Sequence, residues 1–153
     1  MSRPSIHRYK KSNRNPLIAI GMILTFLMLL PIQAGQSSIS LSRHTLKQLV
    51  DVIAHKQGLD PKLVRAVVTV ESAWRPAARS SKDAIGLLQV HYPTWRHKHT
   101  RRELLDPESN LYAGTAILRK YLNESSTLKE ALRKYSGGEP EYYEKVMRAK
   151  KGA

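Results

Sequence analysis

Residues 60–73 read DPKLVRAVVTVESA, and this stretch decides the fold. Asp60 followed by Pro61 is a helix start, because aspartate caps the first backbone N–H groups and proline fits the first helical position. Pro76 restricts the residues before it, so the helix is expected to end near Ala73. Polar residues at spacings of three and four form one stripe, and valines form the opposite stripe. The stretch therefore predicts an amphipathic helix that packs against a core.

Glu71 lies on the apolar side of this helix. It continues the stripe of Val64 and Val68, about 130° from the middle of the polar stripe. It also lies in the last turn, where the helix dipole disfavours negative charge. Both effects raise the pKa of a carboxyl group, and an acid that stays protonated near neutral pH can act as a general acid. The alternative is a structural carboxylate paired with Arg75 or Arg79.

Start and stop signals predict helices along the rest of the domain. Apolar residues recur at helical spacing before Gly58, after the Asp-Pro pair at 106–107, after Thr127 and after Pro140. No alternating pattern of useful length predicts a strand, so the expected fold class is all-α. Residues 74–106 form the irregular part, and loops of this length in a compact domain are usually functional or disordered.

The composition fits one globular domain. The chain has 153 residues, of which 41% are hydrophobic and 25% charged, which excludes a disordered chain and a multi-pass membrane protein. It has no cysteine, so disulfides, thiolate metal sites and a lipid-modified N-terminal cysteine are excluded. The net charge of +14 favours a polyanionic partner, which could be nucleic acid, anionic lipid or an acidic cell-wall polymer.

Residues 1–34 have the pattern of a targeting segment. Five basic residues and no acidic residue precede an apolar run of 14 residues, Leu17 to Leu30, and small residues follow at Ala34 and Gly35. This order is typical of a secretory signal, and the run is short for a spanning helix, which needs about 20 apolar residues. We expect a cleaved signal peptide or, alternatively, an uncleaved membrane anchor through residues 17–30.

The basic excess belongs to the exported domain as well. Residues 35–153 carry 21 basic and 12 acidic residues, a net charge of +9. Export argues against a nucleic-acid partner and favours a polymer of the cell envelope. We therefore expect the domain in the periplasm, either free or anchored in the inner membrane.

Four motifs occur in an order that resembles a known family. They read ES at 71–72, AIGLLQ at 84–89, DPESNLYAG at 106–114 and YSGG at 135–138. Their order and spacing resemble the catalytic domain of soluble lytic transglycosylases, a goose-lysozyme-like group, over residues 44–148. Each motif alone is weak, but four in order are specific.

Two positions depart from the pattern of that family. The family usually has methionine where this chain has Leu88, which is a change of similar volume. It often has asparagine where this chain has Ser136, so the chain lacks an amide that could contact substrate there.

The resemblance implies a lysozyme-like helical fold with a substrate cleft, and no cofactor. It implies cleavage of the β-1,4 bond between N-acetylmuramic acid and N-acetylglucosamine in peptidoglycan, without added water and with 1,6-anhydro ends as products. Most glycosidases use two carboxylates. Here one can serve, because the nucleophile, the muramoyl 6-hydroxyl, is already part of the substrate. Glu71 would protonate the leaving oxygen and then accept the proton of the 6-hydroxyl.

The resemblance also implies roles for other matched residues. Tyr135, on the apolar stripe of its helix, would hydrogen-bond Glu71. Ser72, on the polar stripe, would help hold Glu71 or the sugar. Gly86 would let the backbone approach the substrate, and Gln89 would hydrogen-bond sugar. The expected substrate-binding residues are Ser72, Trp74, Gly86, Gln89, Tyr92, Tyr135 and Ser136.

Aromatic residues and histidines cluster in the irregular stretch. Trp74 and Tyr92 could offer flat aromatic faces to a sugar. Alternatively, Trp74 closes the core under the long loop. For Trp95 we expect this core position. The histidines have no carboxylate or cysteine at metal-ligand spacing, so we expect surface residues and no metal site. They are His91, His97 and His99.

Other functions remain open alternatives. Asp83 would make the enzyme a hydrolytic muramidase if it were a second catalytic carboxylate, but aspartate also favours turns. A non-catalytic peptidoglycan-binding module is opposed by the presence of Glu71, and a cationic membrane-surface or nucleic-acid protein is opposed by the four motifs. A single domain of this size could serve a secretion, conjugation or phage machine.

Overall fold

The computed structural model describes residues 41–152, which are mostly helical, as the predicted all-α class requires. The elements are α2 (Arg43–Lys56), α3 (Pro61–Ser72), β1 (Ala84–Ile85), β2 (Val90–His91), α4 (Tyr92–Trp95), α5 (Arg101–Leu105), α6 (Pro107–Asn123), α7 (Leu128–Tyr135) and α8 (Tyr142–Lys151). The predicted targeting segment, residues 1–34, lies outside this range. Within it, no helix has the length and apolar character needed to cross a membrane.

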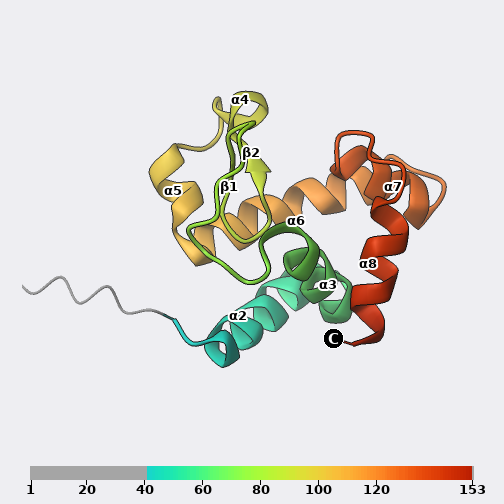
Figure 1. Cartoon of the computed structure of the whole chain (residues 1–153), viewed down its shortest axis with the longest axis horizontal. Helices are drawn as coiled ribbons and strands as arrows, with labels where there is room; N and C mark the ends of the chain where they lie inside the picture. Colours follow the sequence, from blue (N-terminus) through green and yellow to red (C-terminus); the bar gives the residue numbers. More distant parts are fainter. Residues whose placement is uncertain (1–40, 153) are drawn as a thin grey trace, which may run out of the picture. The chain divides into compact units, whose positions relative to one another are not determined.

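Helix α6 runs through the middle of the domain (Figure 1). The hairpin β1-β2, α4 and α5 lie beside its N-terminal half, and α7 and α8 lie at its other end (Figure 1). Helix α3 packs between α2 and α8. The last turn of α3 and the first turn of α8 therefore meet, although they are far apart in sequence.

The start signals in the sequence are confirmed at three helices. Asp60 accepts a hydrogen bond from the backbone N–H of Lys62 at 2.9 Å, and Asp106 accepts one from that of Ser109 at 2.8 Å. The hydroxyl of Thr127 accepts from the next helix at 3.1 Å. The last helix begins later than expected from Pro140, after Glu141, which makes no side-chain cap.

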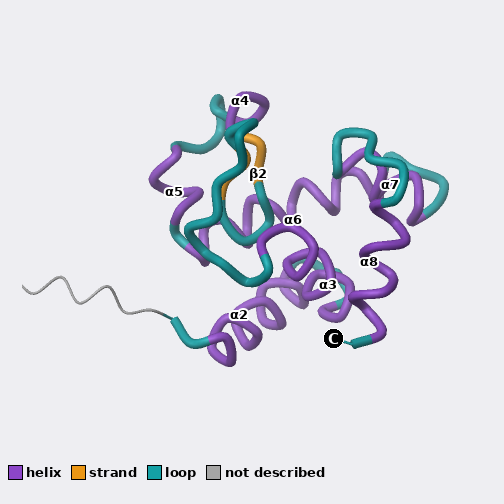
Figure 2. The backbone as a smooth tube through the Cα atoms, in the orientation of Figure 1, coloured by secondary structure: helices purple, strands orange, loops and turns teal. Residues whose placement is uncertain are grey.

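The irregular stretch contains more regular structure than the sequence predicts. Figure 2 shows it as loop interrupted by the antiparallel hairpin β1-β2 and the short helices α4 and α5. These elements have two, two, four and five residues. A periodic pattern cannot be recognised over so few positions. The capping box between Thr100 and Glu103 is the one local signal for α5.

Two hydrophobic clusters flank the cleft described below. The larger is centred on Val64, Val67 and Val68 of α3, which are fully buried as their stripe predicts. The smaller joins the hairpin to α5 and α6 and contains Ile85, Val90, Leu104, Ala113 and Ile117. Tyr135 packs against both clusters.

The buried side chain of Asn110 fixes the loop between the two strands. Its Oδ1 accepts from the N–H of Leu88 at 2.8 Å, and its Nδ2 donates to the carbonyls of Ile85 at 2.8 Å and Leu104 at 2.9 Å. Gly86 has φ +83, and a Cβ there would lie 2.1 Å from Nδ2 of Asn110. The expectation that Gly86 faces substrate is wrong, because this position lies against Asn110 and does not line the cleft.

Gly86→Ala should therefore destabilise the protein more than the same substitution at a glycine that has a positive φ but no close neighbour. Gly137 has φ +73, and an added Cβ meets nothing within 4 Å. We expect Gly86→Ala to lower the free energy of unfolding by about 2–4 kcal/mol and Gly137→Ala by about 1 kcal/mol. Urea denaturation measures both values. Equal losses would contradict the packing role of Gly86.

Candidate active site

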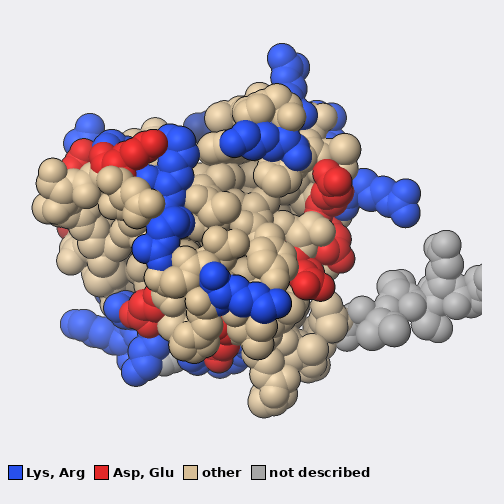
Figure 3. Space-filling view, turned by 180° about the vertical axis from the view of Figure 1, so that it is seen from behind, with Lys and Arg blue, Asp and Glu red and all other residues tan. Residues whose placement is uncertain are grey.

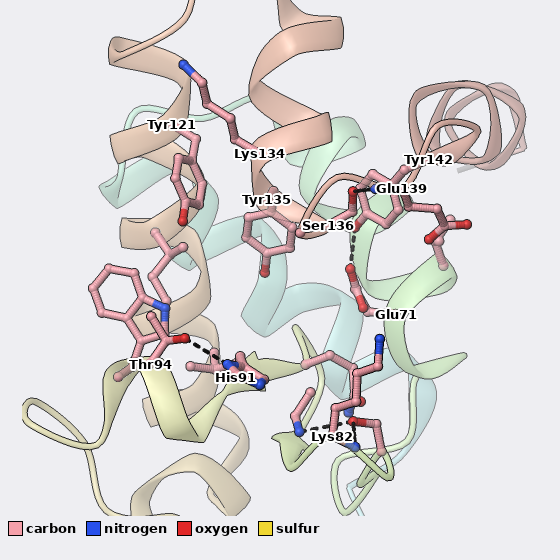
Figure 4. A pocket seen from close by; sticks show the side chains of 18 of the residues that line it. Glu71, Lys82, His91, Thr94, Tyr121, Lys134, Tyr135, Ser136, Glu139 and Tyr142 are labelled. Carbon is pink, nitrogen blue, oxygen red and sulfur yellow. Dashed lines mark hydrogen bonds between the residues drawn. The ribbon is translucent and has the colours of Figure 1, made fainter.

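A cleft of about 720 Å³ lies between α3, the hairpin with α4, and the C-terminal helices (Figure 4). Its walls come from every one of these parts and from the middle of α6. Glu71 of α3 faces the cleft together with Tyr135 of α7 and Tyr142 of α8 (Figure 4). The cleft is therefore built from segments that are up to 75 residues apart in sequence, from Val70 to Lys145.

Glu71 is largely buried, and the hydroxyl of Tyr142 donates a hydrogen bond to its Oε1. Burial raises the pKa of the carboxyl from its ordinary value of 4.5 to about 7, against the opposing effect of the Tyr142 hydrogen bond. The negative charge of Glu139 raises this pKa further. The predicted increase is confirmed, and burial is its main cause.

The structural alternative for Glu71, an ion pair with an arginine, is wrong. Within residues 41–152, no lysine or arginine forms an ion pair with this carboxyl. Nε of Arg75 donates instead to the carbonyl of Ser72 at 3.1 Å. A buried acid without a cationic partner is still partly protonated near neutral pH and can supply a proton.

The expected hydrogen bond between Tyr135 and Glu71 is also wrong. The hydroxyl of Tyr135 donates to the carbonyl of Leu88 at 2.8 Å, whereas Tyr142 takes the position at Glu71. The two rings are stacked, with centroids 6.4 Å apart. Helix α7 ends beside the interstrand loop, and α8 begins opposite the end of α3, which explains the exchange of partners. Tyr142 shares an apolar stripe with Val146, so the sequence indicated only a core residue.

The helical wheel placed Ser72 on the polar, solvent-exposed face of the helix, and this prediction is wrong. It is 1% exposed, and its hydroxyl donates to the carbonyl of Val68 at 3.2 Å. The chain turns back after the helix through Ala73 (φ 50) and Trp74 (φ 67). Trp74 then covers the polar stripe, because its Nε1 donates to the hydroxyl of Thr69 at 2.9 Å.

Gln89 and Ser136 line the cleft, as expected, but both are used to hold loops. Nε2 of Gln89 donates to the carbonyls of Gly86 at 2.9 Å and Ala78 at 3.2 Å. Both partners are acceptors, so the amide oxygen of Gln89 is left for a ligand donor. The hydroxyl of Ser136 donates to the carbonyl of Arg133 at 3.0 Å and accepts from the N–H of Glu139 at 3.1 Å.

The aromatic residues are distributed differently from expectation. Trp74 is 7% exposed, belongs to the larger core cluster and does not line the cleft. Tyr92 lies outside the cleft lining, with the guanidinium of Arg101 at 3.9 Å from its ring centroid. Trp95 packs against the smaller core cluster, as expected, and it also lines the cleft together with Tyr121. Tyr121 had no signal in the sequence beyond its place on the face of α6 that carries Ile117.

Of the three histidines, His91 lines the cleft, whereas Asp83 does not. In the described part of the chain, no three histidine, aspartate or glutamate side chains form a group that could hold a metal ion. Asp83 has φ 60, and its Oδ2 lies 2.6 Å from Nη2 of Arg101, whose hydrogen bond lowers the pKa of the carboxyl. Asp83 does not line the cleft, so its geometry is that of the turn residue that the sequence favoured.

Comparison with known proteins finds a matching family and several relatives. Residues 48–153 match the family described as Transglycosylase SLT domain. A transglycosylase of Enterobacteria phage PRD1 is 33% identical over 91 residues, which cover 60% of this chain and 34% of that protein. The endo-type membrane-bound lytic murein transglycosylase A of Salmonella paratyphi B is 38% identical over 71 residues, covering 40% of this chain and 35% of that protein.

The chain belongs to the transglycosylase SLT domain family. The resemblance seen in its four motifs is thereby confirmed. The chain spans about a third of the length of the relatives that it matches.

The raised pKa of Glu71 makes stability depend on pH. Between about pH 4.5 and pH 7 the folded protein holds a proton that the unfolded chain has lost, so stability falls as pH rises through this window. Glu71→Gln keeps a hydrogen-bond acceptor without the charge. We expect it to stabilise the protein by about 2–3 kcal/mol above pH 7.5 and to have little effect near pH 4. Urea denaturation at both pH values measures this, and a pH-independent effect would contradict it.

Tyr142→Phe should raise the pKa of Glu71 above about 7, because the lost hydrogen bond favours the ionised carboxylate. Tyr143→Phe is the matched control, since Tyr143 is its chain neighbour and packs on the core without contacting Glu71. Carbon-13 NMR titration of labelled glutamate carboxyls measures both. An unchanged pKa in Tyr142→Phe would mean that this hydrogen bond is absent in solution.

Proposed function

We propose that this protein is a peptidoglycan lytic transglycosylase with a lysozyme-like fold, in which Glu71 is the only acid and base. The observation that carries the proposal is one largely buried carboxyl, with a pKa of about 7, on the wall of a cleft in an SLT domain. A group with this pKa is divided between acid and base near neutral pH. It can therefore give a proton and later take one back.

The proposed reaction uses Glu71 twice. The protonated carboxyl donates to the glycosidic oxygen while the bond from that oxygen to C1 of the muramoyl residue breaks. The resulting carboxylate then accepts the proton of the muramoyl 6-hydroxyl, whose oxygen bonds to C1. The products are a free 4-hydroxyl and a 1,6-anhydro end, and Glu71 is protonated again. No water is consumed, so a second carboxylate is not required.

Neighbouring groups have supporting roles in this proposal. The hydroxyl of Tyr142 stabilises the transient carboxylate of Glu71, because it already donates to Oε1. Gln89 offers its amide oxygen to a sugar hydroxyl. Tyr135 holds the carbonyl of Leu88, next to Gln89, and so positions that side chain. Trp95 and Tyr121 offer aromatic surface to sugar rings at a distance from Glu71.

The location and partners of the protein follow from the same proposal. Residues 35–153 form the catalytic domain, and residues 1–34 direct its export to the periplasm or anchor it in the inner membrane. Its substrate is the peptidoglycan strand. The similarity to a phage transglycosylase fits a protein that opens the cell wall for a larger machine. Neither nucleic acid nor a cofactor is part of the proposed activity.

A hydrolytic muramidase is the second candidate function, because a second carboxylate, that of Glu139, lies in the cleft. Glu139 lines the cleft and is close enough for its charge to raise the pKa of Glu71. It forms an ion pair with Lys145. If water were the nucleophile, Glu139 rather than Asp83 would be the candidate base.

Mass spectrometry of peptidoglycan digests distinguishes these functions. The full-length chain should release anhydro-muropeptides, and Glu71→Gln should reduce their rate of release by at least about 10³-fold. Glu108→Gln is the control, because Glu108 is an exposed glutamate of the first turn of α6 outside the cleft. Products heavier by one water, with reducing ends, would refute the transglycosylase. Their loss in Glu139→Gln would establish the muramidase.

A further inference from the structure

Three lysines line the cleft, and two of them are already paired. Lys145 forms an ion pair with Glu139. Nζ of Lys134 lies 2.9 Å from Oε1 of Glu130 and donates to the carbonyl of Glu124 at 2.8 Å. The third, Lys82, makes no ion pair and no side-chain hydrogen bond to any residue within 41–152. Lys82 therefore brings an uncompensated positive charge to the cleft.

The turn that carries Lys82 is held by several contacts. The hydroxyl of Ser80 accepts from the N–H groups of Lys82 at 3.3 Å and Ala84 at 3.0 Å. The N–H of Asp83 donates to the carbonyl of Ser80 at 3.1 Å. The neighbouring carboxylate of Asp83 is bound by Arg101 and so does not neutralise Lys82. These contacts hold the backbone of the turn, from which the exposed side chain of Lys82 reaches the cleft.

The charge around Lys82 favours an anionic ligand. Figure 4 places Lys82 and His91 on the side of the cleft opposite Lys134 and Glu139. Glu71 is largely protonated below neutral pH and offers little negative charge to this side. The face of the molecule seen in Figure 3 carries a column of lysine and arginine side chains, with acidic side chains in smaller groups. A ligand carboxylate on this side of the cleft would be attracted by the ammonium group of Lys82.

We propose that Lys82 forms an anion subsite, which binds a carboxylate carried by the glycan strand next to the bond that is cleaved. This inference rests on the proposed function. The amino sugars of peptidoglycan are neutral apart from the lactyl carboxylate of the muramoyl residue. When a peptide stem is attached, that carboxylate is an amide, and the stem carries the negative charge instead. The subsite makes the enzyme select strands that bear one of these two carboxylates.

Binding to the inactive Glu71→Gln chain tests the subsite without turnover. The ligands are three tetrasaccharides of equal length: a muramoyl strand with peptide stems, the same strand without stems, and neutral N-acetylglucosamine. Calorimetry compares the full-length Glu71→Gln chain with versions that also carry Lys82→Gln, Lys82→Arg or Lys62→Gln. Lys62 is an exposed lysine of α3 that lies outside the cleft and serves as the matched control.

Lys82→Gln should weaken binding of a carboxylate-bearing strand about fivefold, which is the size expected for one partly exposed ion pair. Lys82→Arg should keep the affinity, because it keeps the charge. Affinity for the neutral tetrasaccharide should change by less than about twofold in all variants. The effect of Lys82→Gln should also shrink from about 50 mM to about 500 mM salt, since a solvent-exposed pair is screened.

The two muramoyl ligands identify which carboxylate is bound. A loss limited to the stem-bearing strand assigns the subsite to the stem, and a loss limited to the stemless strand assigns it to the lactyl group. An equal change for all three ligands, no change for any, or no binding of either muramoyl strand would overturn the proposal.

The subsite and the proposed function can fail separately. Lys82-dependent preference in a chain that releases no anhydro product would refute the transglycosylase and leave the subsite standing. Cleavage to anhydro products without a Lys82-dependent preference would support the transglycosylase and refute the subsite.

Discussion

The contact between Glu71 and Tyr142 joins the two ends of the domain and determines what the cleft can do. It exists because the last turn of α3 packs against the first turn of α8, so a carboxyl and a phenol are buried side by side. Burial raises the pKa of the acid, and the phenol opposes this shift. The two effects together leave a carboxyl group that is half ionised near neutral pH, as proton transfer in both directions requires.

Much of the fold could be predicted from the sequence because its helices carry strong local signals. Asp60 and Asp106 cap their helices as expected, and Val64, Val67 and Val68 of α3 are buried. The hairpin and the two short helices were not predicted, since none is long enough to show a period. Asn110 holds β1, the interstrand loop and α5 together, and its three partners are set by the tertiary structure.

The candidate site was predicted in outline and was wrong in several partners. Glu71 could be recognised because a single residue on the wrong face of an amphipathic helix is visible in sequence. The choice between Tyr135 and Tyr142 depends on where two helices end in space, and no periodicity contains that information. The position of Trp74 was left open for a related reason. Two consecutive residues with positive φ return Trp74 to the core, and neither is a glycine that would signal such a turn.

The side chain of Asn110 connects helix α5 to the interstrand loop that leads into the cleft. One amide group bonds to three backbone segments, at Ile85, Leu88 and Leu104, and so couples the interstrand loop to α5 and α6. Gln89 follows directly after this anchored loop. We expect substitutions that displace α5 to shift this loop and, with it, the side chain of Gln89 in the cleft. Substitutions outside the cleft can in this way change the geometry inside it.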